Sequence, residues 1–198
     1  CVDAPLGKYV PSLGSRYATD CLAGTFQAST GQTSCDDADP GHYVDISLGI
    51  AQSTQTACLA GTFNPNTGST TSTDCLVADP GHYVDPSLGT GQSTQTACNA
   101  GTYNPSTGST TSTDCVGADA GHYVSAPRAS SQTPCVAGSY QSETGAVSCI
   151  YSDVGNYVPT EGQTVQTICP AGQDQPQPGS SECLTTHPGT YSSPGSTS

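Results

Sequence analysis

Cysteine is the reactive residue type that recurs along this chain, and its eleven copies follow one alternating rhythm in which a shorter gap alternates with a longer one. Zinc sites usually use cysteines at Cys-x-x-Cys-like spacing, and even neighbours such as Cys21 and Cys35 are much further apart than that. The spacing therefore predicts disulfides, which persist in an oxidising compartment. The cysteines are Cys1, Cys21, Cys35, Cys58, Cys75, Cys98, Cys115, Cys135, Cys149, Cys169 and Cys183.

Histidine and aspartate recur as copies of a few repeat positions. His42, His82 and His122 occupy one such position, and a catalytic centre has no reason to be tiled in this way. We therefore expect that the chain is not an enzyme and has no cofactor. We expect these histidines to be exposed beside a packed tyrosine, and the alternative is that they bind a transition metal across repeats. Oxygen-rich turns could hold calcium or form a solvated acidic edge, and the EF-hand spacing is absent. The acidic residues concerned are Asp39, Asp45, Asp79, Asp85 and Asp119.

The segments between the cysteines repeat as well. Residues 36–75 return as residues 76–115 with only eight of forty positions changed, and the length of this unit is typical of tandem arrays. We expect repeats at 1–34, 35–74, 75–114, 115–148 and 149–182, with 183–198 as the start of a truncated further repeat. The chain is thus expected to be a segment of a longer array in which Cys1 belongs to the repeat pattern. The alternative for Cys1 is the lipid-modified first residue of a lipoprotein.

Each period divides into two half-units with one order of residues: Gly-x-aromatic, a glycine-containing turn, and a Thr/Ser stretch that ends in cysteine. The first half-unit reads PGHYV…QTAC and the second reads AGT(F/Y)…STDC. These stretches predict short strands, and NPNTG and QSETG are turn sequences in which glycine takes the left-handed position. The two longer repeats, 35–74 and 75–114, are extended in both halves, either because adjacent hairpins must match in length or because one unit was recently duplicated.

The composition limits the size of any core. Only 33% of the residues are hydrophobic and there is no tryptophan or methionine, so cross-links must supply much of the order. One aromatic residue in each half-unit is expected to cover the local disulfide, with ligand stacking as the alternative role. These aromatics include Tyr43, Phe63, Tyr83, Tyr103, Tyr123 and Tyr140. The fold class we predict is small, disulfide-rich and mainly β or irregular: an elongated, solenoid-like array of short β-hairpins with essentially no helix.

The charge and hydropathy of the chain exclude some partners. Its formal net charge is −13, which would repel nucleic acid. No stretch approaches the roughly 20 apolar residues that cross a bilayer, so we expect no membrane span. An extracellular or cell-surface protein fits these observations.

The pattern Cys-x-AGT(F/Y)…TG…Cys resembles the cysteine-rich repeats of the ephrin-receptor-like type, which are related in style to growth-factor-receptor cysteine-rich modules, and the resemblance spans essentially the whole chain. The family commonly has a Cys-x-x-Cys step between modules, whereas each step here has one cysteine. The resemblance implies that each short segment closes on itself and that Cys1 is left for a partner upstream. The implied pairs are Cys21–Cys35, Cys58–Cys75, Cys98–Cys115, Cys135–Cys149 and Cys169–Cys183.

A rival register remains open at this point. It closes the longer segments instead, and it leaves Cys183 unpaired. Its pairs are Cys1–Cys21, Cys35–Cys58, Cys75–Cys98, Cys115–Cys135 and Cys149–Cys169.

Serine and threonine make up roughly a quarter of the chain, a composition associated with O-linked glycans. No usable Asn-x-Ser/Thr acceptor is present, since Asn64 and Asn104 precede proline. The alternative is that these residues simply fill strand surfaces. The candidate attachment sites are Thr67, Ser69, Thr70, Thr71, Thr107, Ser109, Thr110 and Thr111.

These features predict a structural component of an extracellular fibril, stalk or surface appendage, which associates with further repeats or copies of itself. The alternative is a multivalent adhesin or receptor-like ectodomain that binds glycan or protein. A fibre tolerates near-identical repeats, whereas a recognition surface should place unlike exposed residues on one repeat.

Overall fold

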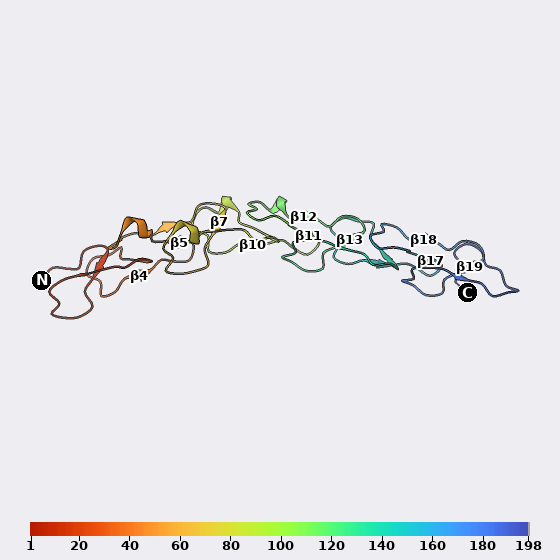
Figure 1. Ribbon diagram of the computed structural model, residues 1–198, viewed down its shortest axis with the longest axis horizontal. Helices are drawn as coiled ribbons and strands as arrows, with labels where there is room; N and C mark the ends of the chain where they lie inside the picture. Colours follow the sequence, from red (N-terminus) through yellow and green to blue (C-terminus); the bar gives the residue numbers. More distant parts are fainter. Residues whose placement is uncertain (198) are drawn as a thin grey trace. The chain divides into compact units, whose positions relative to one another are not determined.

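The computed structural model describes residues 1–197, which form tandem disulfide-linked hairpins in two compact units. Unit 1 comprises Cys1–Thr96 with Thr107–Ser112, and unit 2 comprises Ala97–Ser106 with Thr113–Ser198. Figure 1 shows short strands joined by long loops in both units. The prediction of a small, disulfide-rich, mainly β or irregular fold is confirmed.

Within residues 1–197, all strands are two residues long, and they pair in ten two-stranded sheets. The strands up to the division between the units are β1 (Lys8–Tyr9), β2 (Thr19–Asp20), β3 (Thr25–Phe26), β4 (Asp36–Asp37), β5 (His42–Tyr43), β6 (Thr56–Ala57), β7 (Thr62–Phe63), β8 (Leu76–Val77), β9 (His82–Tyr83) and β10 (Thr96–Ala97). The remaining strands are β11 (Thr102–Tyr103), β12 (Val116–Gly117), β13 (His122–Tyr123), β14 (Thr133–Pro134), β15 (Ser139–Tyr140), β16 (Ile150–Tyr151), β17 (Asn156–Tyr157), β18 (Thr167–Ile168), β19 (Gln173–Asp174) and β20 (Leu184–Thr185).

Each sheet joins the short strand near the start of one half-unit to the residues around the cysteine that opens the next, and this first strand contains an aromatic residue in every sheet except that of β19 and β20. In the sheet of β13 and β14, for example, Tyr123 lies opposite Thr133 and His122 lies opposite Pro134. Short 3₁₀ helices occupy some of the loops in residues 36–115. These helices are η1 (Ile46–Leu48), η2 (Ser72–Asp74), η3 (Pro86–Leu88) and η4 (Ser112–Asp114). The residues added to each half of the two longer repeats thus accompany these helical turns.

Small side chains and sulfur form most of the buried interior, where Phe63 clusters with Ala78 and Val84. Ala38, Ala78 and Ala118 are fully buried, as are Val44 and Val84, which are at most 1% exposed. Six aromatic residues were expected to cover the disulfides. Of these six, Phe63 is buried and the other five are half-buried. The backbones of neighbouring half-units lie close together and leave space inside only for small side chains such as alanine, valine and cystine. Most of the larger aromatic rings therefore lie at the margin of the interior.

Backbone hydrogen bonds connect each half-unit to the next one. In unit 2, the Gly121 N–H donates to the Gln141 carbonyl at 2.7 Å, and the Gly162 N–H donates to the Cys135 carbonyl at 2.8 Å. The equivalent bonds in unit 1 run from Gly7 to Gln27 and from Ala51 to Cys21. Bonds of this kind satisfy the polar backbone groups of loops that have little regular structure.

Alternate half-units also come into contact through glycine. Gly121 has a φ of +84°, and a Cβ added to it would lie 2.8 Å from the carbonyl carbon of Gly162, two half-units further on. In unit 1, added Cβ atoms on Gly7 and Gly41 would overlap the carbonyl groups of Ala51 and Gly91 in the same way. Each half-unit within a unit therefore packs against the next two.

Candidate functional site

Five disulfides connect the cysteines that enclose the second half-unit of each repeat, with Cα–Cα distances between 5.6 and 5.8 Å. The pairs are Cys21–Cys35, Cys58–Cys75, Cys98–Cys115, Cys135–Cys149 and Cys169–Cys183. They are the pairs implied by the family resemblance, and no pair of the rival register is formed among residues 1–197. Cys1 is exposed and has a free thiol in this structure.

Every disulfide has one buried and one half-exposed end. The first cysteine of each pair is at most 1% exposed, whereas the second is half-exposed. An incoming thiolate can reach only the second sulfur, and the thiolate it would displace lies in a buried position where its charge is poorly solvated. This asymmetry favours bridges that resist reduction while the fold is intact.

A groove opens beside the half-exposed sulfur in unit 2. It has a volume of about 380 Å³ and lies between the β13–β14 and β15–β16 sheets. Tyr123 and Tyr151 contribute rings, and Ser139 contributes a hydroxyl that also donates to the Val136 carbonyl at 2.8 Å. The described residues that line it are Tyr123, Val136, Ser139, Ser148, Cys149 and Tyr151.

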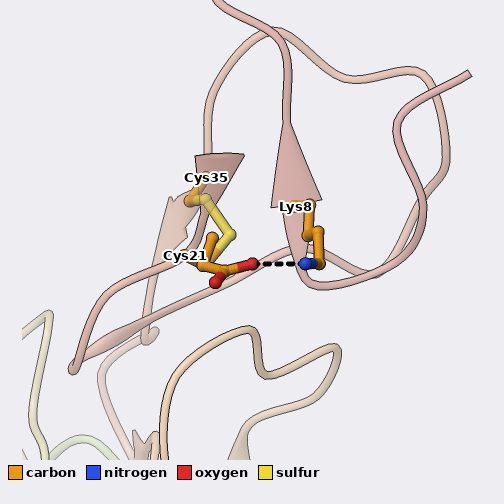
Figure 2. Close-up of polar contacts among 4 residues, drawn as sticks. Lys8, Cys21 and Cys35 are labelled. Atoms are coloured by element: carbon orange, nitrogen blue, oxygen red, sulfur yellow. Dashed lines mark ion pairs between the residues drawn. A yellow bond between two sulfur atoms is a disulfide. The ribbon is translucent and has the colours of Figure 1, made fainter. Parts of the chain in front are cut away.

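Unit 1 has an equivalent groove of about 310 Å³. Its lining is Tyr9, Thr19, Asp20, Leu22, Thr25, Ser34 and Cys35. Five of these residues occupy the same repeat positions as lining residues of the unit 2 groove, as Tyr9 does for Tyr123. Lys8 Nζ lies 2.7 Å from Asp20 Oδ1, and Figure 2 shows this ion pair beside the Cys21–Cys35 disulfide. We call these two sites the disulfide grooves.

In each repeat, a buried side-chain amide holds the loop of the second half-unit in place. In unit 2, Gln141 is 7% exposed, and its Nε2 donates to the Ser148 carbonyl at 2.9 Å while its Oε1 accepts from the Glu143 N–H at 3.1 Å. The position holds asparagine in the two longer repeats and glutamine in the three shorter ones. Its members are Gln27, Asn64, Asn104, Gln141 and Gln175.

These amides were not identified as important by the sequence analysis. Their signal is the constant spacing, because each lies six residues after the first cysteine of a disulfide. In four of the five half-units the amide directly follows the aromatic residue, and this pattern could have predicted a buried polar bridge. A buried amide that satisfies several backbone groups can replace apolar packing in so small a core.

Aspartate–glutamine pairs connect the two ends of four first half-units. The Asp119 N–H donates to Gln132 Oε1 at 2.6 Å, and Gln132 Nε2 donates to Asp119 Oδ2 at 2.6 Å. The same reciprocal pair forms in Asp39–Gln55, Asp79–Gln95 and Asp153–Gln166. Three of the aspartates that sequence reasoning considered for calcium therefore make local hydrogen bonds.

The other two of these aspartates, Asp45 and Asp85, cap the 3₁₀ helices η1 and η3. Hydrogen bonds from the side chain and the backbone N–H of Ser47 hold the pKa of Asp45 below its ordinary value, and Ser87 has the same effect on the pKa of Asp85. Backbone hydrogen bonds from Thr71 and Thr70 lower the pKa of Asp74 in η2. These carboxylates stabilise turns in their ionised form.

The proposed glycan attachment residues differ in their exposure. Thr67 and Thr107 are exposed at loop tips, and Thr111 is also exposed. Thr70, Thr71 and Thr110 are half-buried. Ser69 and Ser109 are buried, and the Ser69 hydroxyl accepts a hydrogen bond from Asn64 Nδ2 at 2.8 Å, so in the folded chain these two are out of reach of a transferase.

Within residues 1–197, no group of three or more His, Cys, Asp or Glu side chains is arranged to hold a metal ion. The histidines at positions 42, 82 and 122 each have Nδ1 within 3.4 Å of the backbone carbonyl two residues before. None of the helices in this described part is long and apolar enough to cross a membrane.

Comparison with known proteins gives no family assignment. No protein-family model matches the chain, and no curated protein matches its sequence. The likeness to ephrin-receptor-like repeats therefore stays a prediction from the sequence.

Proposed function

We propose that this chain is a structural component of an extracellular fibril, stalk or surface appendage built from disulfide-linked repeats. The observation that carries the proposal is the hydrogen bonding between half-units, in which the carbonyl of a buried cysteine accepts from the turn of the following half-unit. Because these bonds join neighbours in sequence, the arrangement can continue with every added repeat, as in other repeat proteins. The net charge of −13 favours the solubility of such a chain.

Electron microscopy of the native material tests this proposal directly. We expect thin fibres or stalks, and we expect small-angle scattering of the isolated, oxidised chain to give an elongated particle. Reduction under denaturing conditions should abolish that form, because the bridges supply much of the order. A compact particle and an absence of fibres in the native material would contradict the structural role.

O-linked glycosylation is a second part of this proposal. The exposed threonines Thr67, Thr107 and Thr111 are the best placed acceptors of those named from the sequence. Sugars on loop tips would shield the chain from proteases. A native mass equal to that of the bare chain, after allowing for the disulfides, would refute it.

The second candidate function is multivalent recognition of a glycan or a protein, in an adhesin or receptor-like ectodomain. The equivalent grooves of units 1 and 2 favour this candidate, since they present similar side chains at two places in the chain. An extracellular or cell-surface location suits both candidates, because persistent disulfides need an oxidising environment.

A further inference from the structure

The disulfide grooves share one chemical character. Four of the six residues that line the unit 2 groove carry a hydroxyl group, namely Tyr123, Tyr151, Ser139 and Ser148. Four of the seven in unit 1 do so as well, namely Tyr9, Thr19, Thr25 and Ser34. Hydroxyl groups both donate and accept hydrogen bonds, and tyrosine rings add flat apolar surface.

The electrostatics of the grooves limit the charge of a ligand. Among the residues that the structure describes, no charged side chain lines the unit 2 groove. In unit 1, the described lining has one charged residue, Asp20, and Lys8 pairs with it. A chain with a net charge of −13 disfavours an anionic ligand, so a neutral ligand fits both sites.

The apolar part of each lining lies beside its hydroxyl groups. Leu22 lines the unit 1 groove and is 68% exposed, and Val136 lines the unit 2 groove and is 65% exposed, so both offer apolar surface to a ligand. In unit 1, Thr25 Oγ1 uses its proton in a hydrogen bond to the Leu22 carbonyl at 2.9 Å, so this oxygen can act toward a ligand as an acceptor. A sugar ring has the matching combination of apolar C–H faces and a rim of hydroxyls.

We propose that the two disulfide grooves bind residues of a neutral saccharide, with Tyr9 in unit 1 and Tyr123 and Tyr151 in unit 2 as the contacting rings. This inference deepens the second candidate function by naming its sites and its ligand class. A proline-rich peptide also uses aromatic grooves, but its proline residues offer only carbonyl acceptors and no donors to the hydroxyl groups of these linings.

The test uses the oxidised full chain with ¹³C-labelled tyrosine rings, titrated with neutral oligomers of β-1,4-glucose, α-1,4-glucose and α-mannose. We expect the ring signals of Tyr9, Tyr123 and Tyr151 to shift with at least one oligomer at millimolar concentration. Tyr17 is 85% exposed and lines neither groove, so its signal should stay in place. No shift of the groove tyrosines with any oligomer would overturn the proposal, and so would a shift with decaproline alone.

Substitutions separate specific binding from general contact with exposed rings. Tyr151 is 71% exposed, so Tyr151→Ala should fold, and we expect it to weaken saccharide binding in unit 2 about tenfold while leaving the response of Tyr9 unchanged. Ser148→Ala provides a second variant at the same groove, and Tyr17→Ala is the matched control. Equal loss of binding in Tyr151→Ala and Tyr17→Ala would refute a specific site. Failure here leaves the fibre proposal standing, because microscopy tests that separately.

Discussion

Replacement of Gly121 by alanine should destabilise unit 2 far more than the same replacement of Gly162. Both glycines have positive φ, +84° and +72° respectively, so each alanine variant incurs about 1–2 kcal/mol of backbone strain. A Cβ on Gly162 meets nothing within 4 Å, whereas a Cβ on Gly121 meets the Gly162 carbonyl carbon at 2.8 Å. The backbones must then separate, which strains the bonds from Gly121 to Gln141 and from Gly162 to Cys135.

Two backbone hydrogen bonds contribute about 2 kcal/mol together, so we expect Gly121→Ala to lose about 3–4 kcal/mol in all. Amide hydrogen exchange of Cys135 is a suitable assay, because its N–H donates to the Gly121 carbonyl at 2.8 Å. A difference of about 2 kcal/mol between the variants corresponds to a roughly thirty-fold difference in its exchange rate. Equal exchange rates in the Gly121→Ala and Gly162→Ala variants would refute the contact between alternate half-units.

Three further perturbations test other parts of the structure. Gln141→Met keeps the side-chain length but removes both loop hydrogen bonds, and we expect a loss of about 2–3 kcal/mol in urea unfolding followed by circular dichroism; an unchanged midpoint would show that the buried amide is dispensable. Replacing Cys135 and Cys149 together by alanine opens a loop with a sequence separation of 14 and should cost about 3 kcal/mol in the same assay, with native stability contradicting the role of the bridge. The pKa of Asp74 is lowered in the folded chain, so the stabilising effect of its carboxylate is present above the ordinary value of 3.8 and is lost as the pH falls through the lowered value. The amide of Thr71, which donates to this carboxylate, should therefore exchange faster only below pH 3.8. Asp74→Asn should remove that pH dependence.

The sequence predicted those parts of the fold that depend on local spacing. The alternating cysteines, the glycine turns and the absence of helical periodicity led to tandem disulfide-linked hairpins, and η2 and η4 are only three residues long. The closing of the shorter segments came from a family resemblance and not from the spacing itself, which allowed two registers.

Other features depend on contacts that no single repeat reveals. The burial of Gln141 results from the loop that folds around it, and the need for glycine at position 121 arises from the carbonyl group of Gly162, in the following repeat. The aromatic residues were expected to cover the local disulfides, and most of them are half-buried, because the closely packed backbones leave interior space for alanine and valine. The disulfide grooves require two adjacent sheets, so their lining could not be assembled from the sequence alone.

Within each unit, contact between each half-unit and the next two limits how a gene for such a chain can change in length. Deleting a single half-unit would place two half-units of the same kind in succession, and turns of the wrong kind would then meet the carbonyl groups of the buried cysteines. Deleting or duplicating a whole repeat keeps every donor opposite its acceptor. The eight differences in forty between residues 36–75 and 76–115 fit a duplication of that kind. Natural length variants should therefore differ by whole repeats, and recombination within a half-unit should be selected against.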